Sequence, residues 1–221
     1  MYWLLFSHIM ALYPCVICFK QFKSSRGDLH LPYTELGAYQ ACYTGMNICA
    51  TAIFSVFYHT YDYNSFPKVL GNYDIWSALD YWASPNTIVT TILYVSRIRS
   101  ELFYCISYAS GVLFLISIVA SSRFMDFMVV FTGGFICLIR MKILWMYIKN
   151  FLPLTAFGAI LLIGAGACYA KALSMEETGY EVWHSLWHFL IFCSAGVFCH
   201  LRAKLDYLLA PAYSRAPADS I

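Results

Sequence analysis

Residues 102–121 read LFYCISYASGVLFLISIVAS, a stretch of twenty residues without a charged side chain. A helix of about 20 apolar residues is long enough to cross the hydrocarbon core of a bilayer. The whole chain has the same character, because 61% of its 221 residues are hydrophobic and only 12% are charged, whereas soluble domains carry about 25% charged residues. We therefore predict an integral membrane protein rather than a soluble domain with a large core.

Six further apolar stretches accompany this one and predict an all-α membrane protein, a bundle of seven transmembrane helices. The expected helices cover residues 2–20, 36–59, 73–95, 102–121, 126–147, 151–171 and 182–202. Arg140 and Lys142 interrupt the fifth helix, and we expect their long side chains to reach toward a headgroup layer. Residues 1–205 are thus predicted to form the transmembrane domain, and residues 206–221 a disordered cytoplasmic tail.

The positive charges predict how the bundle is oriented. Cytoplasmic loops of membrane proteins are enriched in Lys and Arg. If the N-terminus is extracellular, eleven of the fourteen positive residues fall in cytoplasmic segments: Lys20, Lys23, Arg26, Arg97, Arg99, Arg140, Lys142, Lys149, Arg202, Lys204 and Arg215. We therefore predict an extracellular N-terminus and a cytoplasmic C-terminus. The net charge of only +2 offers no basic stripe for nucleic acid, so the expected partners are membrane lipids and other membrane proteins.

Ionisable residues within the apolar helices are the candidates for chemistry, because such residues are costly in a bilayer. His184 and His188 are four residues apart and leave the same face of the seventh helix. Ser55 and His59 have the same spacing near the outer end of the second helix. The predicted topology places His59 at the same depth as the His184 pair, and Asp80 lies about 10 Å into the third helix from its outer end.

Three neutral imidazoles with an open fourth position are a ligand set for catalytic zinc, which activates a water molecule. We therefore predict that His59, His184 and His188 bind zinc. Asp80 would hold or deprotonate the water or orient a ligand, and Ser55 would bond the water or a substrate carbonyl. Each residue also has a structural interpretation: the histidines as interfacial groups beside tryptophans, and Ser55 as a helix–helix hydrogen bond.

The remaining polar residues are interpreted as structural. They are His8 and His200 as packing or interfacial residues, His30 as a solvated loop residue, Asp62 and Asp74 as capping or solvated groups, and Cys15 and Cys18 as packing residues of the first helix. The CxxC spacing of the two cysteines lacks the βαβ context of a redox motif.

Four segments together resemble a known family. They are Phe54-Ser55-x-Phe57-Tyr58-His59-x-x-Asp62, Tyr73-Asp74-Ile75, Leu79-Asp80-Tyr81 and His184-Ser185-x-Trp187-His188. They are similar to the transmembrane protein 8 family, which belongs to the wider superfamily of alkaline ceramidases and progestin and adipoQ receptors. The resemblance extends from the first helix to the seventh.

The resemblance implies a plasma-membrane protein that acts in cell–cell fusion. In size the chain is similar to the short member of the family that drives myoblast fusion, whereas larger members carry an extracellular region before the seven helices. The resemblance also implies a zinc site of His59, His184 and His188, a homodimer, and a second fusion protein as partner. One departure is that the vertebrate short member ends in a cysteine-rich, lipid-modified tail, while residues 210–221 contain no cysteine.

Two further functions stay open beside membrane fusion. The first is a zinc-dependent intramembrane lipid hydrolase acting on an amide or ester bond, with Asp80 as base and Ser55 helping to stabilise the oxyanion. In that case the zinc is catalytic, whereas in a fusion protein it would tie two helices together. The second is a receptor without catalysis, for which the chain offers little loop to bind a ligand.

Overall fold

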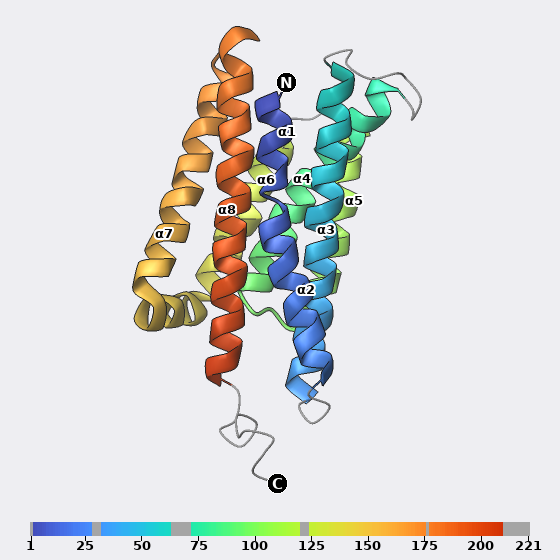
Figure 1. The fold of residues 1–221 in the computed structure, drawn as a ribbon. Helices are drawn as coiled ribbons and strands as arrows, with labels where there is room; N and C mark the ends of the chain where they lie inside the picture. The colour runs from blue at the N-terminus through green and yellow to red at the C-terminus, as the bar shows by residue number, and fades with distance from the viewer. Residues whose placement is uncertain (1, 28–31, 63–71, 120–123, 176, 210–221) are drawn as a thin grey trace.

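The computed structural model describes residues 2–27, 32–62, 72–119, 124–175 and 177–209. In these ranges the chain forms eight helices and no strand: α1 (Tyr2–Ile9), α2 (Leu12–Gly27), α3 (Pro32–Asp62), α4 (Tyr73–Val95), α5 (Ser100–Val119), α6 (Phe124–Ile139), α7 (Met141–Leu173) and α8 (Glu177–Leu209). The helices pack side by side as a bundle (Figure 1), and α1 and α2 form a single crossing with a break in it. The predicted all-α bundle of seven transmembrane helices is therefore confirmed.

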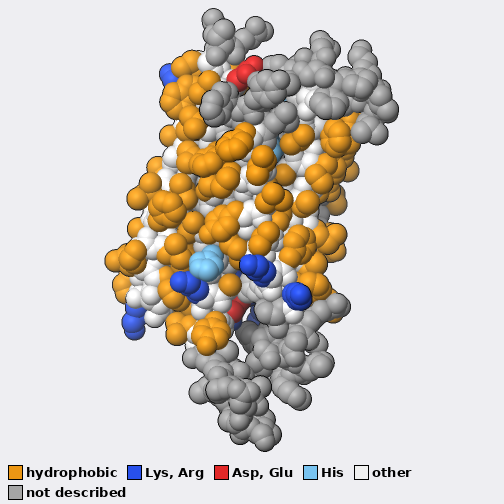
Figure 2. Space-filling model, viewed as in Figure 1, with side chains coloured by type: hydrophobic (Ala, Val, Ile, Leu, Met, Phe, Trp, Pro, Cys, Tyr) orange, Lys and Arg blue, Asp and Glu red, His pale blue; other side chains and the backbone are white. Residues whose placement is uncertain are grey.

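The bundle is apolar outside, and polar side chains are buried inside it beside a hydrophobic core. Hydrophobic side chains cover the middle of the face in Figure 2, and Lys and Arg gather toward its lower end. On α5, for example, Leu115 and Ile116 are exposed, while Ser107, Ser110 and Ser117 are buried. Four helices are long and apolar enough to span a membrane by themselves, over Gly37–Thr60, Ser100–Val119, Met141–Leu173 and Gly179–Leu209. This distribution suits a membrane protein, since lipid surrounds it and polar groups must find partners inside.

The break between α1 and α2 has a local cause in Pro14. A proline ring clashes with the carbonyl four residues earlier and removes one helical hydrogen bond, and here that carbonyl belongs to Met10. The helix is interrupted at Met10 and Ala11, with the Ala11 amide donating to the His8 carbonyl at 3.0 Å. The predicted first helix is thus two segments, and His8 lies in the last turn of the first of them.

The fifth predicted helix, residues 126–147, is wrong in its second half. α6 ends at Ile139, and Met141 begins α7. The first part of α7 lies across the lower end of the bundle (Figure 1) and turns upward at Phe151, whose φ of −141° and ψ of 38° are not helical. Pro153, which cannot donate to the Lys149 carbonyl, follows this kink, and the Thr155 hydroxyl donates to the carbonyls of Tyr147 and Phe151 at 3.2 and 3.0 Å. In a bilayer such a kink persists because side chains satisfy the freed carbonyls.

Arg140 helps to cover the end of α4, and the expectation that its side chain reaches toward a headgroup layer stays a prediction. The last carbonyls of a helix have no partner within it, and five consecutive ones receive side-chain donors here. The donors are Arg202 to the carbonyl of Tyr94, Tyr147 to Val95, Arg140 to Ser96 and Arg97, and Gln40 to Ile98, at 2.6–3.0 Å. Arg140 therefore ends α6 by binding α4.

An ionic network ties the same region to the end of α8. Asp206 pairs with Arg97 at 3.0 Å and with Arg202 at 2.5 Å, and it accepts a hydrogen bond from Gln21 at 3.0 Å. α8 continues through Leu209, so residues 206–209 belong to the bundle rather than to the predicted tail. Residues 210–221 lie outside the described residues, and their disorder stays a prediction.

Replacing Arg202 with leucine is expected to destabilise the protein by about 3 kcal/mol, since breaking a buried ion pair leaves polar groups without a partner. Arg202 is only 5% exposed, and its loss would remove the side-chain donor to the Tyr94 carbonyl and one of the two cations paired with Asp206. The measurement is unfolding of the detergent-solubilised protein, with the exposed Arg99→Leu as control. The control should change stability by no more than about 0.5 kcal/mol. Equal stability of the two variants would contradict a stabilising role for the network.

Candidate metal centre

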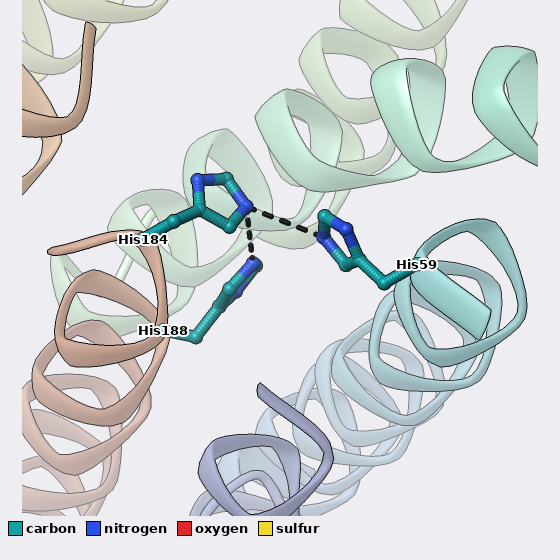
Figure 3. Close-up of side chains that lie close together, drawn as sticks. All are labelled: His59, His184 and His188. Carbon is teal, nitrogen blue, oxygen red and sulfur yellow. Dashed lines mark hydrogen bonds between the residues drawn. The ribbon is translucent and has the colours of Figure 1, made fainter. Parts of the chain in front are cut away.

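Three histidines from two helices meet inside the bundle. His59 lies in the last turn of α3, and His184 and His188 lie one turn apart on α8. Their side chains point toward one another (Figure 3), with the His184 Nε2 atom 3.2 Å from His59 Nε2 and 3.0 Å from His188 Nε2. All three residues are buried. The predicted pairing of the end of the second membrane helix with the start of the seventh is therefore present.

The geometry and chemistry of this group fit a metal ion. One ligand atom from each histidine lies within 4.8 Å of the other two, and among the described residues only these three form such a group. Imidazole nitrogens suit zinc, copper, iron and nickel. The group is enclosed by aromatic rings, with Tyr180 stacked on His184 at 4.8 Å and Trp187 4.3 Å from His188, measured between ring centroids. These contacts restrict the rotamers of the histidines.

The two predicted catalytic residues lie close to each other, on neighbouring helices. Asp80 on α4 is 9% exposed and accepts a hydrogen bond from Ser84 Oγ at 3.2 Å. The Ser55 hydroxyl on α3 is fully buried and faces the same carboxylate without forming a hydrogen bond to it. Asp80 does not belong to the close group of ligand atoms. Asp80 is therefore not one of the candidate metal ligands.

A cavity of about 200 Å³ opens beside the histidines, with His188 in its wall. Its lining comes from α3, α4, α6, α7 and α8 and is almost entirely apolar. Ser84, the residue that bonds Asp80, is part of the same wall. The sequence analysis did not predict this cavity. It brings a hydrocarbon-lined space into contact with the candidate metal centre.

His8 also lies next to the candidate metal centre. From the sequence it was interpreted as a packing or interfacial residue. Its ring centroid lies 4.3 Å from that of His188 and 6.1 Å from that of His59, and the residue is 5% exposed. Its signal in the sequence was weak, because no second histidine stands at helical spacing from residue 8. Ser84 was also missed, although it stands four residues after Asp80.

The other polar residues have structural places where they are described. Cys15 and Cys18 lie in the core, with Cys18 Sγ 3.8 Å from Cys199 Sγ, so their interpretation as packing residues agrees with the structure. Asp74 is exposed in the first turn of α4, where Asn72 rather than Asp74 caps the helix by accepting from the Ile75 amide. His30 and the Asp62 side chain lie outside the described residues.

A comparison of the sequence with models of known protein families shows the family of this chain. A family model described as "Protein of unknown function (DUF3522)" matches residues 38–189. The chain belongs to this family. The DUF3522 match contains His59, Asp80, His184 and His188, whereas His8 precedes it. Searches of curated proteins and of solved structures found no match.

Replacing His8 with alanine in this DUF3522 protein is expected to weaken metal binding by about 10-fold without abolishing it. Residues that orient metal ligands typically contribute 10- to 100-fold in affinity, and His8 packs on the His188 ring. The measurement is competition for zinc with a chelator of known affinity. His8→Phe keeps a ring at this position and should recover most of the loss, and the distant His200→Ala is the control. An unchanged affinity in His8→Ala would exclude the role.

Proposed function

We propose that this protein is a metal-dependent lipid hydrolase that cleaves an amide or ester bond within the membrane. One observation carries the proposal, namely that the three-histidine group adjoins an apolar cavity through His188, which belongs to both. A site for a water-soluble substrate would have no use for hydrocarbon walls, whereas the acyl chain of a lipid fits them. The donor set suits zinc, which is the ion we propose for the centre.

The residues around the centre have complementary parts in this proposal. Bound zinc supplies Lewis acidity toward a carbonyl oxygen and activates a water molecule. Asp80, held by Ser84, accepts the proton of that water and passes it to the leaving group. Ser55, which faces the Asp80 carboxylate, would bond the developing oxyanion or the water. The Tyr180 and Trp187 rings keep bulk water away from the histidines.

The proposal is tested with purified protein in lipid nanodiscs and two model lipids. A ceramide presents an amide bond, and a diacyl glycerophospholipid presents an ester bond. We expect one of them to release fatty acid in the zinc-loaded protein, and release to stop after chelation and return when zinc is restored. The lipid-facing Leu138→Ala, whose side chain is 70% exposed, should retain the activity. No metal-dependent product from either bond class would contradict the proposal.

A second candidate function is plasma-membrane fusion of the kind that myomaker carries out in myoblasts. The observation that favours it is that the three histidines join the last turn of α3 to the first half of α8, while Asp80 stands outside the ligand group. Zinc would then be a clamp between helices, and the partners would be a second copy of the chain or another fusion protein. Mixing of two differently labelled cell populations that express the protein tests this function. Only multinucleate cells with both labels support it.

A further inference from the structure

The first part of α7, residues 141–150, lies in a different direction from the rest of that helix. A straight helix of all 33 residues of α7 would be about 50 Å long, whereas the hydrocarbon core of a bilayer is about 30 Å thick. The bend at Phe151 divides α7, and the part from Phe151 to Lys171 is by itself about 30 Å long. One crossing is therefore complete without residues 141–150, which lie across the lower end of the bundle (Figure 1). This segment falls at the level of a headgroup layer.

One side of the segment packs on the bundle. Successive residues of an α-helix are turned by about 100°, so Ile143, Leu144 and Tyr147 share a side. Tyr147 is buried and donates its hydroxyl to the Val95 carbonyl at 2.7 Å. Ile143 and Leu144 are partly buried against the hydrophobic core. These contacts fix which side of the segment faces away from the protein.

The side that faces away carries an apolar stripe next to two lysines. Met141, Trp145 and Ile148 are exposed, Trp145 by 63%, and their spacing of four and three residues aligns them on the helix. Lys142 and Lys149 are also exposed, and because they are seven residues apart they leave the helix in nearly the same direction, beside the stripe. No acidic residue occurs in the sequence of α7, and among the residues that the structure describes neither lysine forms an ion pair. The two positive charges are thus available to a negatively charged partner.

The surface of a membrane is the surrounding that suits both parts of this face. Tryptophan is enriched at the headgroup level of bilayers, and a helix lying in the interface places apolar side chains among acyl chains and its lysines toward anionic headgroups. A soluble anion would have no use for the apolar stripe. In the orientation predicted from the positive charges, this end of the bundle meets the cytoplasmic leaflet, where the anionic lipids are found.

We propose that residues 141–150 form an interfacial helix that binds the headgroup of an anionic phospholipid through Lys142 and Lys149. The two lysines stand one on each side of Trp145, about 10 Å apart along the helix, and their ammonium groups would contact the phosphate and carboxylate of a headgroup such as phosphoserine. Trp145 would lie beside the acyl chains. This surface does not involve the histidines, so the binding is expected whether or not the protein is a hydrolase.

The test is titration of the detergent-solubilised protein with dioleoyl phosphatidylserine and, separately, dioleoyl phosphatidylcholine, with bound lipid counted by native mass spectrometry. Wild type should prefer phosphatidylserine by about 25-fold, because each lysine near an anionic headgroup contributes about 5-fold. Lys149→Gln should reduce this preference by about 5-fold, and Lys142→Gln combined with Lys149→Gln should abolish it. The matched control is Lys171→Gln, which removes an exposed lysine from the other end of the same helix and should keep the wild-type preference.

Two further measurements identify the partner as a lipid. Trp145→Ala should weaken the binding of both lipids alike and leave the preference for phosphatidylserine in place, since it removes apolar contact and no charge. Glycerophosphoserine, which is the headgroup without acyl chains, should not displace phosphatidylserine at equal concentration. Displacement would overturn the assignment to a lipid and indicate a site for soluble anions. Equal affinity of wild type for the two lipids, or the same preference in Lys149→Gln and Lys171→Gln, would overturn the binding surface itself.

Discussion

Replacing His184 with alanine is expected to remove the metal from the protein. The His184 Nε2 atom lies between those of the other two histidines, at 3.2 Å from His59 and 3.0 Å from His188, so the variant would keep only two separated ligands. Loss of an outer-shell partner already costs 10- to 100-fold in affinity, and we expect loss of this ligand to cost more than about 100-fold. Elemental analysis of purified wild type should find close to one zinc per chain, and the variant should contain almost none.

The control for this experiment is His200→Ala, which removes a histidine from the same helix but outside the ligand group. It should retain zinc at the wild-type level. A folded wild-type protein that contains no metal would contradict the metal centre itself and leave the three histidines as packing groups. In that case the proposed function would lose the observation on which it stands.

Replacing Asp80 with asparagine is expected to separate catalysis from structure. The amide has the shape of the carboxylate and can still accept from Ser84, whose Oγ lies 3.2 Å from the present oxygen, but it cannot take up a proton. Removal of a general base typically lowers turnover by 10²- to 10⁴-fold. We therefore expect lipid hydrolysis to fall by roughly 10²-fold or more while zinc content stays at the wild-type level. The measurement is release of fatty acid together with zinc per chain.

Asp74→Asn is the matched control, because Asp74 is an exposed carboxylate in the first turn of the same helix. It should leave both turnover and zinc unchanged. If Asp80→Asn keeps full turnover, Asp80 is not the base. If no variant has hydrolase activity but the wild type fuses cells and Asp80→Asn does so equally well, the zinc acts as a clamp between α3 and α8.

The sequence could predict the helices because hydrophobicity and helical period are local properties. The third predicted helix, residues 73–95, has the bounds of α4 as observed. The fifth predicted helix, residues 126–147, was wrong in its second half because apolar residues continue on both sides of Arg140. Nothing in the local sequence marks the end of α6 there. What ends the helix is a contact distant in sequence, since Arg140 donates to the Ser96 and Arg97 carbonyls.

In the candidate site, too, local sequence patterns predicted some residues, and contacts distant in sequence determined the others. The spacing of His184 and His188, and a topology that puts His59 at their depth, were sufficient to predict the three ligands. His8 was missed because a single histidine carries no spacing signal, and its place beside His188 depends on how α1 packs against α8. Ser84 was missed for a related reason, because its role depends on the cavity wall that it shares with His188.

The sequence by itself determined that this protein is a helical membrane bundle and which three histidines meet in it, because burial in lipid and the helical repeat act on neighbouring residues. Only the tertiary structure decided that an apolar cavity adjoins His188 and that distant residues such as Leu144 help to line it. A cavity is the space that several helices leave between them, and its shape depends on their kinks and crossings rather than on any one segment. The bend at Phe151, which lays the start of α7 across the end of the bundle, is the clearest example.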